Sequence, residues 1–130
     1  MQIEIERLAL QLENPFTLSY GTSTLRENVV VRISDGHYTG LGEAAVVPYY
    51  HETPERVIRY ATDPATLAAL GENPLWLEDA LDRLPPADSI PARAAIDTAL
   101  HDLWGQQLGQ PLYRLWGHNP ARCPHSSFTV

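Results

Sequence analysis

Two pairs of charged side chains at helical spacing are the first candidates for chemistry. Glu78 precedes Asp82 by four residues, and Asp97 precedes His101 by the same interval, so each pair would lie on one face of a helix. Either pair could hold a cation. Mg²⁺ and Zn²⁺ sites need further converging ligands, however, and solvated helix faces carry such pairs often. We therefore expect structural or surface roles for all four residues.

A second candidate is the stretch that contains His118, Cys123 and His125. These are metal-ligating residue types, but their spacing matches no zinc signature. His125 and Ser126 could be imagined in a nucleophilic triad, yet the strained GxSxG turn of such a site is missing. We predict that the chain holds no metal ligands and no catalytic residues.

The run from Gly40 to Ala45, GLGEAA, matches the loose dinucleotide-binding pattern GxGxxA. That pattern works only where a strand is followed by a helix whose N-terminus meets the phosphates. Here the run lies in the return strand of a predicted hairpin and continues into Val46, Val47 and Pro48. We therefore reject nucleotide binding and expect the glycines to allow close packing of the backbone.

An aromatic cluster, Tyr49, Tyr50 and His51, follows the proline that ends the third predicted strand. Aromatic residues on a loop more often form a contact surface than a core. Together with Phe16 and Tyr20 on an earlier loop, they suggest two loops at one end of the sheet. Ligand contact and packing against another domain are equally open alternatives at this point.

Composition excludes several classes of function. The net charge is −7 and all nine basic residues are arginine, so the basic patches of nucleic-acid binding are lacking. A lysine base or Schiff base is impossible within a chain without lysine. No apolar run reaches the ~18 residues of a membrane span and no signal peptide is visible. We expect a cytoplasmic protein that binds neither membranes nor nucleic acid.

Three segments are predicted as strands: residues 2–12, 28–34 and 37–46. Asp35-Gly36 supplies the tight turn between the second and the third. In the first strand the apolar phase changes between Ile5 and Leu8, which predicts a bulge there. The sheet is therefore expected to be a three-stranded antiparallel meander.

Residues 14–27, rich in turn-forming side chains, are predicted as a long loop. Further along, Thr53, Asp63 and Asn73 each stand directly before a proline, an arrangement typical of helix starts. The segment from about residue 91 to 108 has a wide apolar stripe and is the most strongly predicted helix. A bundle of helices should thus follow the sheet.

Two motifs near the end of the chain resemble a known signature. Residues 92–105 read ARAAIDTALHDLWG, and residues 111–117 read PLYRLWG. They resemble the mandelate racemase and muconate lactonizing branch of the enolase superfamily. The upstream pieces agree in order, at residues 14–16, 27–33 and 40–44, so the resemblance covers nearly the whole chain.

The resemblance implies an α+β capping domain, similar to the enolase N-terminal domain, over residues 1–120. Residues 121–130 would be a linker and the start of the first strand of a (β/α)₇β barrel that is absent. In the family, the barrel carries a lysine or histidine base and the carboxylates that hold Mg²⁺. The base and the metal therefore belong to a full-length parent only, and this chain alone is predicted to be inactive.

Two capping loops of the family correspond by position to residues 16–24 and 47–53. Through the resemblance, six residues are expected to contact a small-molecule carboxylate substrate: Phe16, Tyr20, Gly21, Tyr49, Tyr50 and His51. The second loop is similar to dipeptide epimerases. Family members that act on Ala-Glu dipeptides carry an arginine in the first loop, where this chain has residues 20–23, YGTS. We therefore predict that an apolar or neutral group faces that loop.

Other parents stay open, namely a muconate-type cycloisomerase or an o-succinylbenzoate synthase. A free-standing binding or interaction module is the competing class of function. The implied partner of the capping domain is the C-terminal barrel of the same enzyme, and the parent is expected to be a homo-oligomer. Without a barrel, the apolar surface that faces it would be exposed, so the isolated piece is predicted to form dimers or larger oligomers.

Overall fold

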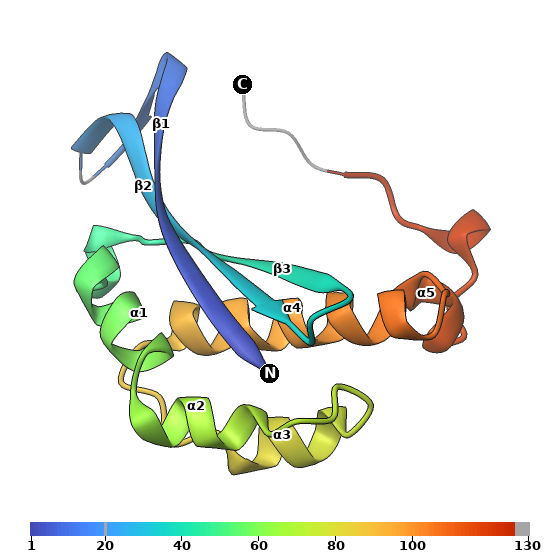
Figure 1. Ribbon diagram of the computed structural model, residues 1–130. Coiled ribbons are helices and arrows are strands. Elements are labelled where there is room, and N and C mark those ends of the chain that lie inside the picture. Colours follow the sequence, from blue (N-terminus) through green and yellow to red (C-terminus); the bar gives the residue numbers. More distant parts are fainter. Residues whose placement is uncertain (20, 127–130) are drawn as a thin grey trace.

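A three-stranded antiparallel sheet forms the first half of the protein. The computed structural model describes residues 1–19 and 21–126. The strands are β1 (Gln2–Leu18), β2 (Gly21–Ser34) and β3 (Thr39–Ala44), in the spatial order β1-β2-β3. Helices cover one face of the sheet (Figure 1). The predicted α+β meander followed by a helical bundle is confirmed.

The helices follow the sheet in the chain. They are the 3₁₀ turn η1 (Pro48–Tyr50), α1 (Pro54–Ala61), α2 (Pro64–Leu70), α3 (Leu77–Arg83), α4 (Ile90–Gln107), α5 (Leu112–Leu115) and the 3₁₀ turn η2 (Pro120–Arg122). None of the helices in the described part of the chain is long and apolar enough to cross a membrane. The start of a barrel strand was expected at the end of the segment of residues 121–130, and positions 127–130 of that segment lie outside the described residues.

Side-chain caps begin two of the helices as the sequence predicted. Thr53 Oγ1 accepts a hydrogen bond from Arg56 N at 3.3 Å, and Asp63 Oδ1 accepts one from Ala65 N at 2.8 Å. Asn73 Oδ1 accepts a hydrogen bond from Leu75 N in the same way. The turn that follows Asn73 does not continue as a helix, however, and α3 begins only at Leu77. The prediction that a helix starts at Asn73 was wrong because a local cap can close a single turn without starting a helix.

The prediction of a long loop at residues 14–27 was wrong. Most of this segment forms the far end of the β1–β2 hairpin, in which Phe16 pairs with Ser23 and Leu18 with Gly21. Turn-forming residues are tolerated here because the neighbouring strand satisfies their backbone hydrogen bonds. The first loop therefore belongs to a protruding two-stranded ribbon.

The bulge predicted between Ile5 and Leu8 is also absent, since pairing continues unbroken from Gln2 to Gln11. The register shift lies between Gln11 and Phe16 instead. The change of apolar phase has another cause. β3 pairs with β2 over Val29–Ser34, which lies opposite residues 2–7 of β1. Beyond residue 7 the hairpin has lost its third strand, so the face that carries apolar side chains changes.

The core lies between the sheet and α4, the helix that the apolar stripe predicted. Its fully buried apolar residues on these elements are Val29, Val31, Ile33, Ala44, Ala92, Ala95, Ile96, Ala99, Leu100 and Leu103. Gly40 and Gly42 lie on the same face of β3, where a Cβ atom would overlap the backbone oxygens of Ala99 and Ala95 respectively. The prediction that these glycines allow close backbone packing is confirmed.

The third strand ends at Ala44 rather than at Val46 as expected. After Ala44 the chain leaves the sheet, and Val46 N donates to the side-chain oxygen of Asn28 at 3.2 Å. The predicted turn between β2 and β3 is present. Asp35 Oδ1 accepts hydrogen bonds from His37 N and Tyr38 N, both at 2.8 Å.

This turn gives a pH-dependent prediction. The backbone N–H groups of Tyr38 and His37 lower the pKa of Asp35 below its ordinary value. A carboxylate whose pKa is lowered in the folded state stabilises the fold above the unfolded pKa of about 4, and this contribution disappears as the pH falls through the folded pKa. We expect Asp35→Asn to be less stable than the wild type at pH 7 and equal to it near pH 2. Urea denaturation at both pH values, with Asp82→Asn as an exposed control, tests the prediction. A difference that persists at the low pH would contradict it.

Candidate functional site

A cleft of about 870 Å³ lies between the tip of the β1–β2 hairpin and the segment that follows β3. The hairpin contributes one wall and the segment from Ala45 to Tyr50 the other. The lining residues are Phe16, Leu18, Gly21, Thr22, Ser23, Arg26, Asn28, Ala45, Val46, Val47, Pro48, Tyr49 and Tyr50. The two loops that the sequence placed at one end of the sheet therefore face the same cleft.

Four of the six predicted contact residues line this cleft: Phe16, Gly21, Tyr49 and Tyr50. Tyr20 lies outside the described residues. His51 is not among the lining residues; it ends η1 in a left-handed conformation. The structure thus places Phe16 of the hairpin and the two tyrosines around one cleft, and His51 lies outside its lining.

Two lining residues were missed by the sequence analysis as site residues. The Arg26 guanidinium lies over the Phe16 ring, with its central carbon 5.5 Å from the ring centroid. Asn28 connects the walls, because its amide donates to Glu43 Oε1 at 2.6 Å while its oxygen accepts from Val46 N. The only sequence signal at Asn28 was its polar side chain at the start of the β-branched run of residues 28–34. The position of Arg26 depends on strand pairing.

The tyrosine wall is open to solvent. The Tyr49 and Tyr50 side chains are 58% and 69% exposed, and their rings meet edge to face with centroids 5.2 Å apart. On the hairpin, Leu10, Phe16, Leu18 and Leu25 are also exposed. Exposed apolar groups that lie around one cleft are typical of a surface for contact with a ligand or another protein segment.

The arrangement is that of a binding surface. The cleft is lined by apolar and aromatic residues, by the cation Arg26 and by the polar residues Thr22, Ser23 and Asn28, the usual composition of a site for a small organic molecule. Comparison with known sequence families identifies the domain. Residues 2–117 match the family described as mandelate racemase/muconate lactonizing enzyme, N-terminal domain. The chain belongs to this family.

Several proteins that are similar to this chain are epimerases. The L-Ala-D/L-Glu epimerase of Bacteroides thetaiotaomicron is 40% identical over 124 residues, which is 93% of this chain and 32% of that protein. The substrate-liganded L-Ala-D/L-Glu epimerase of Bacillus subtilis superposes with a TM-score of 0.78 at 30% identity, over 88% of this chain and 33% of that one. The Enterococcus faecalis dipeptide epimerase, complexed with Mg and L-Leu-L-Tyr, gives a TM-score of 0.78 at 28% identity, with the same two coverages. The chain therefore spans about a third of the length of these relatives.

The residues that the structure describes do not form a Mg²⁺ site. Over residues 1–19 and 21–126, no group of three or more His, Cys, Asp or Glu side chains could hold a metal ion. Of the pairs considered from the sequence, His101 Nδ1 lies 2.7 Å from Asp97 Oδ1, and the His101 ring meets Trp116 edge to face. Glu78 and Asp82 are exposed on α3. Cys123 is an exposed free thiol.

Proposed function

We propose that this protein is the capping and specificity domain of a Mg²⁺-dependent epimerase that acts on dipeptides. The observation that carries the proposal is the cleft between the hairpin tip and residues 45–50, which is lined by Phe16, Tyr49 and Tyr50. A domain of this kind encloses the substrate and excludes water, while a barrel supplies the base and the metal. The epimerase names of the relatives support the same reaction class.

In this proposal, residues 1–120 form the capping domain and residues 121–130 connect it to a barrel. Its partners are then the barrel of the same enzyme and a small-molecule carboxylate. The exposed apolar residues of the hairpin and of the tyrosine wall are the surface that would meet them. Because the chain has no lysine and no described metal cluster, it should be inactive by itself. A muconate-type cycloisomerase is the second candidate, since the family description names muconate lactonizing enzyme.

The substrate side chain near the hairpin tip is proposed to be apolar or neutral. Phe16, Leu18, Tyr49 and Tyr50 supply most of the large side chains around the cleft. An apolar wall excludes a carboxylate, because desolvating a charge without a partner is costly.

The presence of Arg26 in the cleft favours a second candidate, a substrate with an acidic side chain. Its guanidinium lines the cleft and could pair with a carboxylate. In the structure, however, the guanidinium lies against the Phe16 ring, where it acts as part of the aromatic wall. Activity on apolar and acidic dipeptides separates the two candidates.

A domain exchange tests the proposed function. Residues 2–117 of this chain would replace the matching region of the Bacteroides thetaiotaomicron epimerase, and exchange of the dipeptide α-proton with deuterated solvent would be followed with Mg²⁺ present. We expect the exchanged enzyme to be active and the 130-residue protein alone to show no exchange. We also expect the exchanged enzyme to prefer L-Ala-L-Leu over L-Ala-L-Glu. Its ratio of kcat/KM for these two dipeptides should be about tenfold or more higher than the ratio for the unmodified Bacteroides thetaiotaomicron epimerase, which is the discrimination that an apolar pocket can give.

Three outcomes separate the possibilities. Preference for L-Ala-L-Glu that disappears in Arg26→Met would replace the apolar assignment by the acidic one. Conversion of cis,cis-muconate but of no dipeptide would favour the cycloisomerase. Exchange catalysed by the 130-residue protein alone would refute its inactivity.

A further inference from the structure

The tyrosine wall of the cleft ends in an unusual backbone conformation. Among the residues that the structure describes, His51 is the one non-glycine residue with a positive φ, at 59°. Its N–H donates to Pro48 O at 2.9 Å, which closes the η1 turn that carries Tyr49 and Tyr50. Non-glycine residues keep such a conformation only where their surroundings hold it. The contacts of His51 therefore show what sets the position of the wall.

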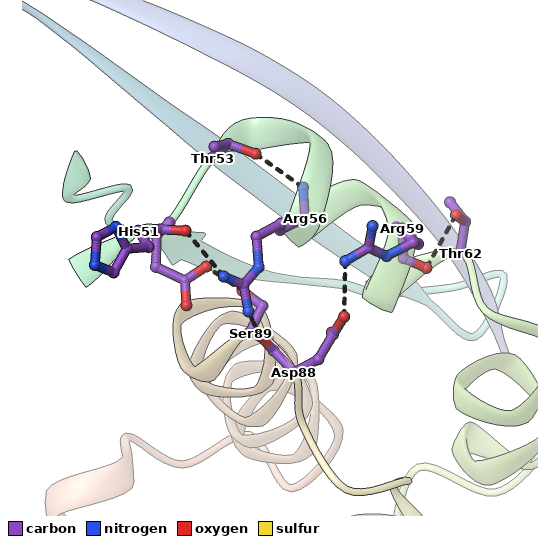
Figure 2. A network of polar contacts seen from close by, with 8 residues as sticks. His51, Thr53, Arg56, Arg59, Thr62, Asp88 and Ser89 are labelled. Carbon is purple, nitrogen blue, oxygen red and sulfur yellow. Dashed lines mark hydrogen bonds and ion pairs between the residues drawn. The ribbon is translucent and has the colours of Figure 1, made fainter. Parts of the chain in front are cut away.

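Arg56, on the first turn of α1, holds this residue. Its Nη1 donates to the His51 carbonyl oxygen at 2.9 Å, and its Nη2 donates to the carbonyl oxygen of Asp88 (Figure 2). The planar fork of one guanidinium thus connects the loop before α1 with the loop before α4. A lysine could not make both bonds in this geometry.

A second link joins the same two loops. Ser89 Oγ donates to Glu52 Oε2 at 2.8 Å, with Ser89 fully buried and Glu52 only 8% exposed. Ser89 is the N-cap residue of α4, yet its side chain makes no capping bond to that helix. A buried carboxylate is tolerated here because it accepts a hydrogen bond beside the N-terminus of an 18-residue helix.

We propose that Arg56 and Glu52 are positioning residues for substrate recognition. They fasten the segment of residues 47–53 to the start of α4 at two points, and so fix where Tyr49 and Tyr50 stand in the cleft. Neither side chain lines the cleft wall that the tyrosines form. The effect of these two residues on substrate binding rests on the proposed function of the cleft. The hydrogen bonds that attach residues 47–53 to the start of α4 do not depend on that function.

Hydrogen exchange on the 130-residue protein tests the fastening directly. Arg56→Met should lower the protection of the Tyr50 and His51 amides by about tenfold, the loss expected for one or two hydrogen bonds, while the amides of α4 keep theirs. Arg59→Met is the matched control. Arg59 lies on the same helix and bonds the exposed carboxylate of Asp88 at 2.7 Å, without reaching His51. Arg56→Lys keeps the charge and should fall between wild type and Arg56→Met.

Equal protection in Arg56→Met and Arg59→Met would overturn the proposal. If Arg56→Met does not fold, Arg56→Lys and Ser89→Ala give the same comparison against Arg59→Met. In the domain-exchanged epimerase, Arg56→Met should raise the KM for the dipeptide by about tenfold with a smaller change in kcat, and Arg56→Lys should restore part of it. An inactive exchanged enzyme would reject the proposed function, and the hydrogen-exchange result would still decide the fastening.

Discussion

Gly42→Ala should lower the free energy of unfolding by about 3 kcal/mol, the upper range for inserting an atom into a packed core. The added Cβ would overlap the carbonyl group of Ala95. Because the obstacle is helix backbone, no side-chain rotation relieves it, and β3 and α4 must move apart. The movement would also weaken the contacts of the buried residues that lie between the sheet and α4.

Urea denaturation followed by circular dichroism measures this effect. Leu41→Ala is the matched control, because Leu41 neighbours Gly42 on β3 and is 51% exposed. A surface substitution of this kind should change stability by no more than about 0.5 kcal/mol. If the two variants unfold at the same urea concentration, β3 does not lie close enough to α4 at Gly42 to exclude a Cβ atom.

The second large effect is expected at the centre of α4. Leu100→Ala should destabilise the fold by about 3 kcal/mol, because it removes a side chain that is only 1% exposed and leaves a cavity. Leu108→Ala, just past the end of the same helix, removes an equal number of atoms from a side chain that is 43% exposed. Its cost should be below about 1 kcal/mol. Similar losses in both variants would show that α4 does not bury the stripe inferred from its sequence.

Local sequence signals predicted much of the fold. Thr53 and Asp63 begin helices because a side-chain cap and a following proline act within one turn. The apolar periodicity of α4 predicted its buried face. Apart from the helix start at Asn73, the failures lay in the sheet, where pairing is non-local. Residues 14–27 have the composition of a loop, yet strand pairing over the hairpin supplies their hydrogen bonds.

The candidate site was predicted in part for the same reason. Phe16, Tyr49 and Tyr50 are aromatic residues in segments that the sequence predicted as loops, and that composition alone marked them as a contact surface. Arg26 lines the cleft because the hairpin register places it there. The sequence analysis did not single out Arg56, since its bonds reach residues as far away in sequence as Asp88.

The sequence by itself determined the helix caps, the apolar faces, the absence of a lysine base and the motifs of the N-terminal domain family, because each of these is a property of neighbouring residues. Only the tertiary structure decided the length of the hairpin, the cleft between its tip and the tyrosines, and the fastening of that wall to α4. Those features join residues distant in sequence, and their geometry is set by how the sheet and the helices pack together.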